Sequence, residues 1–221
     1  MKESEGIKKH ICEIGKRMYA AGFVAANDGN ISVRFGKGRY LCTPTGVSKG
    51  FMTPEMICLV DDEGTQLEGD LPRTSEILLH LEFYHQIESI NAVTHAHPPH
   101  ATAFAVVGES PPVGVMPEAE IFLGPVPLAE YATPGTQALA DSILRHLKAK
   151  ANTILLANHG VVSCGPTLEQ AYFHLETVNA YCRTVLFARQ IGKERTFNDQ
   201  QIKELLAIKE SMGIEDPRLD N

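Results

Sequence analysis

Apolar residues recur along the chain with two different periods. In residues 7–21 and 75–86 they return every three to four positions, which is typical of amphipathic helices. Further helices are expected at residues 99–107, 136–149, 168–190 and 199–211. Short apolar runs predict strands at residues 31–35, 40–42, 57–60, 92–95 and 153–158.

Turn sequences rich in glycine, asparagine and aspartate separate the early strands. Residues 110–134 contain six of the 13 prolines, so this segment is expected to be irregular, with one short strand at 120–123. Several strands follow one another too closely for a strict strand–helix–strand alternation. No linker or repeat divides the chain. We therefore predict a single α/β domain over residues 1–221.

Composition narrows the class of protein. The 221 residues are 43% hydrophobic and carry a net charge of −7, without a basic cluster, which argues against nucleic acid as a partner. No apolar run approaches the roughly 20 residues that span a bilayer, and the polar N-terminus lacks the apolar core of a signal peptide. The five cysteines show no C-x-x-C spacing and are typical of buried thiols in a reducing compartment. A cytoplasmic protein without a membrane partner is expected.

Two histidines follow an apolar strand. His95 and His97 point to the same side if they lie at its end, with Cβ atoms roughly 7 Å apart, and two prolines stop the strand directly after them. His159 follows a second apolar run and precedes Gly160. Three histidines with an open fourth position describe a catalytic zinc site. The alternative is that each is simply hydrogen-bonded locally. His100 is ambiguous, and no special role is expected for the histidines in predicted helices, which are His10, His80, His85, His146 and His174.

Three segments offer backbone N–H groups to an anion. Thr74-Ser75-Glu76 begins a predicted helix, where hydroxyls and the helix dipole favour negative charge. An ordinary N-cap with an acidic first turn explains these residue types equally well. The glycine-containing turns at 27–30 and 44–46 could also approach a ligand closely, although the spacing of a P-loop is absent.

Six segments, in this order, resemble the class II aldolase/adducin family: GNISVR, TPTG, TSE, THAHPPHATAFA, YATPGT and ANHGVV. The resemblance covers residues 7–189. It implies a single three-layer α/β domain with a central, mainly antiparallel sheet flanked by helices. It also implies a homotetramer whose active sites lie between neighbouring subunits.

The resemblance also assigns roles to residues. It implies that Glu76 is the proton donor and acceptor and can ligate the metal when no substrate is present. The metal would be Zn²⁺, with Mn²⁺ or Co²⁺ as alternatives. The implied metal ligands are Glu76, His95, His97 and His159. The implied phosphate-binding residues are Gly29, Asn30, Thr45, Gly46, Thr74 and Ser75.

The implied reaction is reversible cleavage of a ketose 1-phosphate, such as L-fuculose 1-phosphate, to dihydroxyacetone phosphate and an aldehyde. A zinc-stabilised enediolate would be the intermediate, with the metal acting as a Lewis acid. Within the family the alternatives are a pentulose-phosphate 4-epimerase, a methylthioribulose-phosphate dehydratase and a sugar-acid phosphate decarboxylase. A non-enzymatic adducin-like module is a further alternative, but it predicts lost metal ligands, whereas this chain keeps them.

One position departs from the family pattern. Family aldolases supply a tyrosine from a neighbouring subunit as the acid toward the aldehyde oxygen, and this chain has Met116 there. The C-terminal tail also lacks a tyrosine that some members use. Glu118, Glu120, a water molecule or the more distant Tyr131 could substitute. Substrate specificity is therefore expected to depend on residues 116–123 and on the C-terminal helix.

Overall fold

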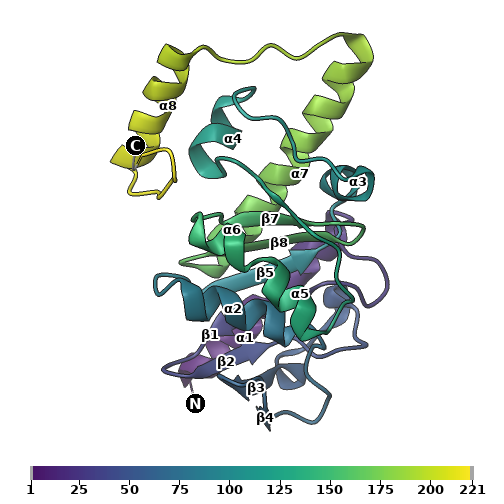
Figure 1. Cartoon of the computed structure of the whole chain (residues 1–221). Helices are drawn as coiled ribbons and strands as arrows, with labels where there is room; N and C mark the ends of the chain where they lie inside the picture. The colour runs from purple at the N-terminus through teal and green to yellow at the C-terminus, as the bar shows by residue number, and fades with distance from the viewer. Residues whose placement is uncertain (1, 220–221) are drawn as a thin grey trace.

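The computed structural model describes residues 2–219, and in these residues the strands form one eight-stranded sheet (Figure 1). The strand order is β4-β3-β2-β1-β5-β8-β7-β6, and each neighbouring pair is antiparallel except the parallel pair β6–β7. The strands are β1 (Asn30–Arg34), β2 (Arg39–Cys42), β3 (Cys58–Asp61), β4 (Gln66–Glu68), β5 (Ala92–Ala96), β6 (Leu128–Ala129), β7 (Thr153–Leu156) and β8 (Gly160–Gly165).

Helices cover both faces of this sheet. The helices are α1 (Lys2–Ala20), α2 (Ile77–Gln86), α3 (Pro99–Val107), α4 (Pro117–Phe122), α5 (Gln137–Ser142), α6 (Leu144–Lys148), α7 (Leu168–Ile191) and α8 (Asp199–Ser211). Two short 3₁₀ helices, η1 (Lys49–Phe51) and η2 (Pro54–Met56), lie between β2 and β3. None of the helices in the described part of the chain is both long and apolar enough to cross a membrane.

The alternation of side chains along the strands produces two apolar cores. Leu41 and Leu155 point to one face, where α1, α3 and α7 pack. Their neighbours Tyr40 and Ile154 point to the other face and pack with α2, α5 and α6. In Figure 1 the second set of helices lies in front of the sheet. The expected α/β fold, with a mainly antiparallel sheet flanked by helices, is confirmed.

Several element predictions were wrong or incomplete. Residues 120–123, expected as a strand, are the end of helix α4 and its C-cap, Leu123. The helix begins with Pro117 at its first position and has Glu118 and Glu120 in its first turn. Both features favour a helix start. The helix expected at 136–149 is two helices that meet at Ile143. The sequence reading did not anticipate the short strands β4 and β6, or the buried strand β8.

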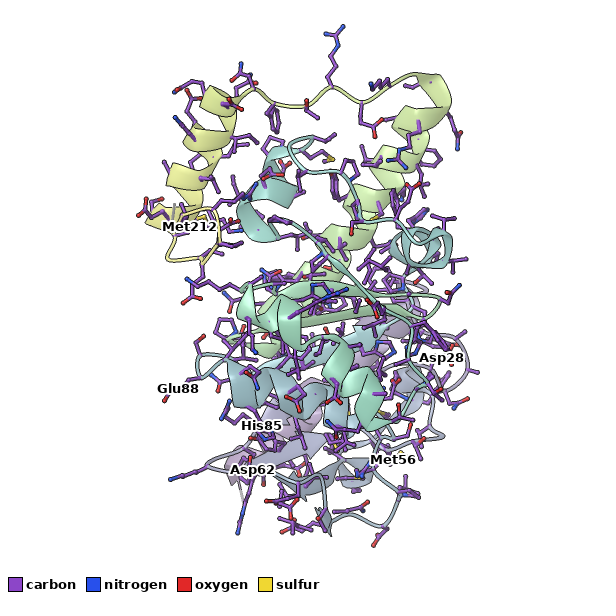
Figure 2. The ribbon with its side chains drawn as sticks, viewed as in Figure 1. Asp28, Met56, Asp62, His85, Glu88 and Met212 are labelled. Carbon is purple, nitrogen blue, oxygen red and sulfur yellow. The ribbon has the colours of Figure 1, made fainter. Side chains whose placement is uncertain are left out.

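The C-terminal region packs against α4 through charged groups. After α7, residues 192–198 run to α8, which carries Met212 just past its end (Figure 2). Lys209 Nζ lies 2.8 Å from Asp216 Oδ2, and Arg218 Nη1 lies 2.6 Å from Glu120 Oε2. All but Arg218 are almost fully buried. These four residues are called the C-terminal charge cluster below.

Candidate metal and carboxylate site

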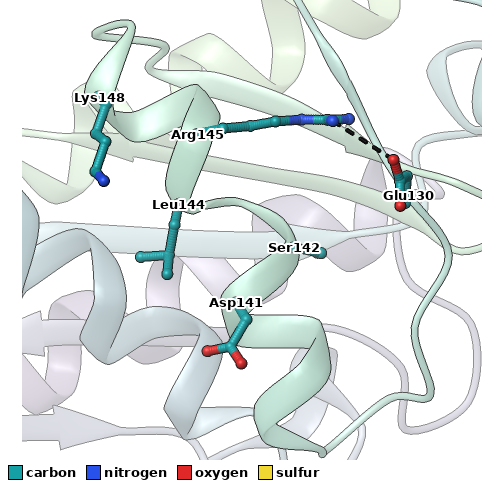
Figure 3. A pocket seen from close by; sticks show the side chains of 6 residues that line it. All are labelled: Glu130, Asp141, Ser142, Leu144, Arg145 and Lys148. Carbon is teal, nitrogen blue, oxygen red and sulfur yellow. Dashed lines mark hydrogen bonds and ion pairs between the residues drawn. The ribbon is translucent and has the colours of Figure 1, made fainter.

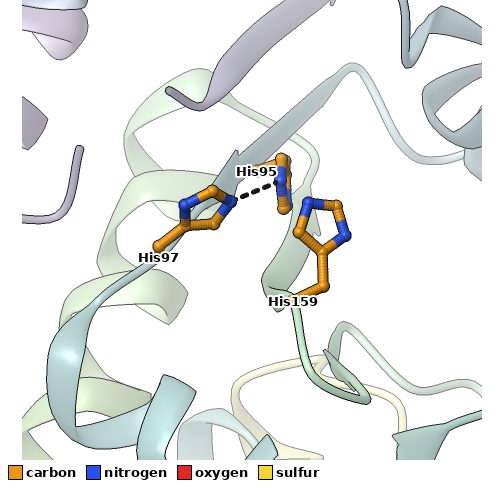
Figure 4. Close-up of side chains that lie close together, drawn as sticks. All are labelled: His95, His97 and His159. Atoms are coloured by element: carbon orange, nitrogen blue, oxygen red, sulfur yellow. Dashed lines mark hydrogen bonds between the residues drawn. The ribbon is translucent and has the colours of Figure 1, made fainter. Parts of the chain in front are cut away.

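Sheet pairing brings three histidines together (Figure 4). His95 lies on β5 and His97 just beyond its end, while His159 lies in the turn between β7 and β8. Because β5 pairs with β8, with Ala96 opposite Val161, this turn sits beside the end of β5. The ring centroids are 4.6 to 5.1 Å apart, and one nitrogen of each ring lies within 4.8 Å of the others.

The tight turn before β8 sets the position of His159. Asn158 has a positive φ of 55°, a conformation that asparagine tolerates better than most residues. Gly160 follows, and a Cβ atom there would lie 2.5 Å from Cδ2 of His97 and 2.6 Å from the Ala96 carbonyl oxygen. Only glycine therefore lets the two strand ends approach closely enough for the rings to meet.

Hydrogen bonds orient the rings. Nδ1 of His95 donates to the carbonyl oxygen of Val161 at 2.9 Å. Burial lowers the pKa of His95 to about 3, so the ring is neutral and its Nε2 atom carries a bare lone pair. Nδ1 of His97 lies 3.4 Å from Oδ2 of Asp28, the carboxylate–histidine arrangement common around metal ligands. Burial also lowers the pKa of His159.

Glu76 faces these rings from the start of α2. Its Oε2 atom lies 3.3 Å from Nε2 of His95 and accepts a 2.8 Å hydrogen bond from Nδ2 of Asn30. Its Oε1 atom lies 3.6 Å from Nε2 of His159 and is buried without a hydrogen-bond partner in the described residues. Burial by itself would raise the pKa of Glu76, but His95, Asn30 and His159 together outweigh it and lower the pKa. The carboxyl group is therefore ionised at neutral pH.

The donor set fits a divalent cation. Nε2 of His95 carries no proton, and it lies 3.3 Å from Nε2 of His97 and 3.3 Å from Oε2 of Glu76. Two of these three atoms, Nε2 of His95 and Oε2 of Glu76, are acceptors that face each other with no hydrogen between them. Two ligands bound at 2.0–2.1 Å to a tetrahedral metal lie about 3.3–3.4 Å apart. A cation between these atoms would relieve their repulsion, so His95, His97 and His159 could hold a metal ion.

Three loops expected to bind phosphate lie beside this group. Pro44 and Arg73 form an isolated β-bridge, and the Thr45 N–H donates to the Pro72 carbonyl oxygen at 2.9 Å. These contacts place residues 45–46 beside residues 74–75. Nζ of Lys49 donates to the carbonyl oxygens of Asn27 and Val47, so it joins the loop at 27–30 to the loop at 44–47.

The loop at 27–30 also packs directly on β5. Gly29 has a φ of +72°, and a Cβ atom there would lie 2.8 Å from the carbonyl oxygen of His95. The structure thus brings the predicted turns and the predicted metal ligands into one region, although the turns are far apart in the sequence.

Comparison with known proteins shows the family to which the chain belongs. The family model for "Class II Aldolase and Adducin N-terminal domain" matches residues 9–186. The chain belongs to this family. It is 35% identical to an L-fuculose phosphate aldolase of Methanococcus maripaludis over 166 residues, which are 75% of this chain and 88% of that protein. It is 32% identical to a 3-oxo-tetronate 4-phosphate decarboxylase of Haemophilus influenzae over 203 residues, 90% of this chain and 95% of that protein.

A solved structure of the same fold supports the assignment. The chain superposes on an L-fuculose 1-phosphate aldolase with a TM-score of 0.85 and 26% sequence identity, covering 95% of this chain and 97% of the other. The resemblance that the six motifs indicated is therefore confirmed at the level of the family and its fold.

Sequence reasoning missed three parts of this family member's site. It gave no role to His80, overlooked Asp28 as the partner of His97, and did not foresee that Asn30 contacts Glu76. A signal existed for His80, because residues four apart on a helix share a face, and His80 lies four positions after Glu76. No comparable local signal exists for the other two contacts.

A surface depression of about 410 Å³ lies elsewhere (Figure 3). Charged side chains dominate its lining, and Arg145 forms an exposed ion pair with Glu130 at 3.4 Å. It contains none of the predicted site residues; its lining is Glu130, Asp141, Ser142, Leu144, Arg145 and Lys148. The chemistry of the histidine group therefore does not extend to it.

Proposed function

We propose that this protein is a metal-dependent class II aldolase that reversibly cleaves a ketose 1-phosphate, most like L-fuculose 1-phosphate, to dihydroxyacetone phosphate and an aldehyde. Membership of the family and the similarity to named aldolases support a lyase that acts on a sugar phosphate. The observation that carries the proposal is Glu76, whose carboxylate lies 3.3 Å from His95 through Oε2 and 3.6 Å from His159 through the buried and unpartnered Oε1 atom.

The three histidines would hold the metal, with Zn²⁺ the first candidate and Mn²⁺ or Co²⁺ the alternatives, and Glu76 would be a further ligand without substrate. When bound, the metal would supply Lewis-acid stabilisation of the negative charge that develops during cleavage. Asp28 would orient His97, and the Val161 carbonyl would orient His95, as outer partners of metal-bound histidines usually do.

Glu76 would carry the proton. Its lowered pKa keeps it ionised before condensation, so in that direction it can accept a proton from the carbon of dihydroxyacetone phosphate through Oε1. In the cleavage direction the protonated carboxyl group would return this proton to the same carbon. The phosphate would rest on the three loops, which supply orientation from a part of the substrate remote from the bond that breaks. The residues proposed for this contact are Gly29, Asn30, Thr45, Gly46, Thr74 and Ser75.

The test is Glu76→Gln, assayed with L-fuculose 1-phosphate by release of dihydroxyacetone phosphate. Loss of a positioned acid–base group typically lowers turnover by about 10²–10⁴-fold. The three histidines remain in this variant, so it is loaded with metal before the assay and its metal content is measured beside its turnover. Glu82→Gln, on the same helix, is the matched control and should retain activity. Near-normal turnover by metal-loaded Glu76→Gln would disprove the assignment.

Decarboxylation of a 3-oxo sugar-acid phosphate is the second candidate, and Met116 favours it. Aldol cleavage needs a base to remove the proton from the hydroxyl group that becomes the aldehyde, and a thioether cannot do so. Glu120 is also unavailable, since its two carboxylate oxygens accept from the Gly114 N–H and from Arg218. Loss of carbon dioxide needs no such base. The Haemophilus influenzae relative bears this activity in its name.

Both reactions leave the same enediolate, so release of dihydroxyacetone phosphate alone cannot distinguish them. Loss of carbon dioxide from the four-carbon substrate 3-oxo-tetronate 4-phosphate gives this same three-carbon product. Measuring carbon dioxide and aldehyde separately, with both substrates and one enzyme preparation, decides between them. The substrate with the higher kcat/KM identifies the reaction.

We further propose a homotetramer with active sites between subunits, as the family resemblance implies. Val106 and Val107, at the end of the helix that begins two residues after His97, are 54% and 68% exposed and provide apolar surface for contact. Sedimentation analysis of the purified protein tests the stoichiometry. The five cysteines lie within the described residues and are free and buried, which supports the proposed cytoplasmic location.

A further inference from the structure

A continuous chain of hydrogen bonds leads from the Glu76 carboxylate into the protein interior. Asn30 Nδ2 donates to Glu76 Oε2 at 2.8 Å, and Asn30 Oδ1 lies 2.5 Å from His80 Nε2. His80 Nδ1 lies 2.7 Å from Ser32 Oγ, which in turn lies 2.7 Å from Tyr84 OH. All five side chains are buried, and those of His80 and Ser32 are completely inaccessible to solvent.

The Glu76 carboxylate at one end of this hydrogen-bond series determines where each proton lies. A carboxylate oxygen only accepts, so the NH₂ group of Asn30 must face Glu76 and its carbonyl must face His80. Nε2 of His80 therefore carries the hydrogen. Burial lowers the pKa of His80 to about 4, so Nδ1 is bare and accepts from Ser32. Ser32 then accepts from the hydroxyl group of Tyr84.

We propose that His80 is a positioning residue: its Nε2–H group fixes the orientation of the Asn30 amide, and the amide in turn holds the Glu76 carboxylate against the histidine group. This inference rests on the proposed function, because it concerns the residue that would carry the proton. His80 acts on Glu76 through Asn30. The sequence alone predicted no special role for this histidine.

Asn30 is suited to this task because its amide has two N–H groups. One donates to Glu76, and the other remains for the substrate phosphate that the loop at 27–30 is proposed to bind. The orientation that His80 imposes thus serves both contacts. A flipped amide would present its carbonyl oxygen to the carboxylate and to the phosphate, which would repel both.

Two matched substitutions separate positioning from packing. The side-chain amide of glutamine reaches the place of Nε2 in histidine, whereas the shorter asparagine reaches only the place of Nδ1. We expect His80→Gln to keep the donor to Asn30 and most of the activity. His80→Asn should keep the contact to Ser32 but lower kcat by about 10- to 100-fold, the usual range for outer partners of a site. His85→Asn, on the same helix and half exposed, is the control.

The kinetic test uses metal-loaded protein with L-fuculose 1-phosphate and 3-oxo-tetronate 4-phosphate. Crystal structures of the two His80 variants give a readout independent of turnover: the Asn30–Glu76 contact should persist in His80→Gln and be lost in His80→Asn. Solid-state ¹⁵N NMR of the histidine-labelled native protein, with His80→Gln to assign the signal, should show the Nε2–H tautomer at His80.

The outcomes are distinct from those of the proposed function. An Nδ1–H tautomer of the neutral ring, or an intact Asn30–Glu76 contact in His80→Asn, would overturn the inference, as would equal kcat values for the two variants. If neither substrate is turned over while the tautomer and the contact are as expected, the proposed function fails and the positioning of Glu76 by His80 stands.

Discussion

Two buried clusters of polar groups in this protein differ in how completely they satisfy themselves. In the C-terminal charge cluster each acceptor faces a donor: Asp216 accepts from Lys209 and Arg218, and Glu120 accepts from Arg218 and the Gly114 N–H. In the histidine group, bare acceptors face one another and one carboxylate oxygen of Glu76 has no partner among the described residues.

This difference separates a structural role from a functional one. A buried ion pair recovers the cost of its own desolvation only with good geometry and satisfied neighbours, which the C-terminal charge cluster has. A buried group that leaves acceptors unpaired costs free energy unless a ligand completes it. The histidine group is therefore the part of the molecule that could bind a cation, and the C-terminal charge cluster is the part that holds α8 to α4.

The largest expected effect comes from removing a ligand from the histidine group. His159→Ala removes one of the three nitrogens, so we expect bound metal to be lost and turnover to fall by at least about a thousandfold, since several kcal/mol of charge stabilisation disappear. Elemental analysis and turnover measure the two effects. His10→Ala, on α1 and far less buried, is the control. A His159→Ala protein with a full metal complement and normal turnover would remove the distinction.

Breaking the C-terminal charge cluster should lower the stability of the fold instead. Lys209→Met leaves Asp216 with one charged partner fewer in a buried place, so the free energy of unfolding should fall by about 3–5 kcal/mol. Below the new melting temperature, the metal content should match that of the native protein. Chemical denaturation measures the change. The double variant Lys209→Met with Asp216→Leu should lose less than the single one; a larger loss would contradict this reading.

The C-terminal charge cluster also makes the free energy of unfolding depend on pH. Burial alone would raise the pKa of Asp216, but Arg218 and Lys209 outweigh it and hold the pKa well below the ordinary value of 3.8. Above about pH 5 the stabilisation is complete. As the pH falls further, the unfolded chain binds the proton before the folded chain does, so the free energy of unfolding decreases.

Acid unfolding curves of the native protein and of Asp216→Asn test this dependence. Below about pH 4 the native curve should fall more steeply, because the variant lacks the group that titrates. Equal slopes for the two proteins would show that Asp216 does not contribute to the acid sensitivity.

The smallest effect concerns the close approach of Gly160 to His97, which brings the histidine group together. In Gly160→Ala the new Cβ atom would displace the His97 ring, so metal affinity should fall by about 10- to 100-fold. Gly6→Ala is the matched control: it lies in α1 with nothing within 4 Å of the new atom, and it should stabilise the fold by about 0.5–1 kcal/mol. Metal titration and thermal unfolding give the two readouts. Unchanged metal affinity in Gly160→Ala would refute the steric argument.

Local patterns predicted most of the long elements. The helical period in residues 7–21 and the apolar run in 92–95 correspond to α1 and β5. Prediction failed where local preference was weak or ambiguous, as at residues 120–123: residues 120–122 are helical because Pro117 starts a helix, and Leu123 is the C-cap. Strand β8 escaped notice because its glycine and valine run has no alternation, being buried on both faces.

The candidate site shows the same boundary. His95 and His97 were evident from their spacing, since two positions along a strand define one side. Their convergence with His159 depends on the pairing of β5 with β8, more than 60 residues apart in the sequence. The contact of Asn30 with Glu76 likewise depends on where α2 packs against β1.

The sequence by itself determined the class of protein, the periods of its main helices and strands, and the residue types able to bind a metal and carry a proton. Only the tertiary structure decided which of the nine histidines meet and which ring nitrogen of His80 carries the proton. It also decided in which buried cluster every acceptor has a donor. The physical reason is that periodicity is a local property of the backbone, whereas the environment of a buried polar atom is set by segments that become neighbours only on folding.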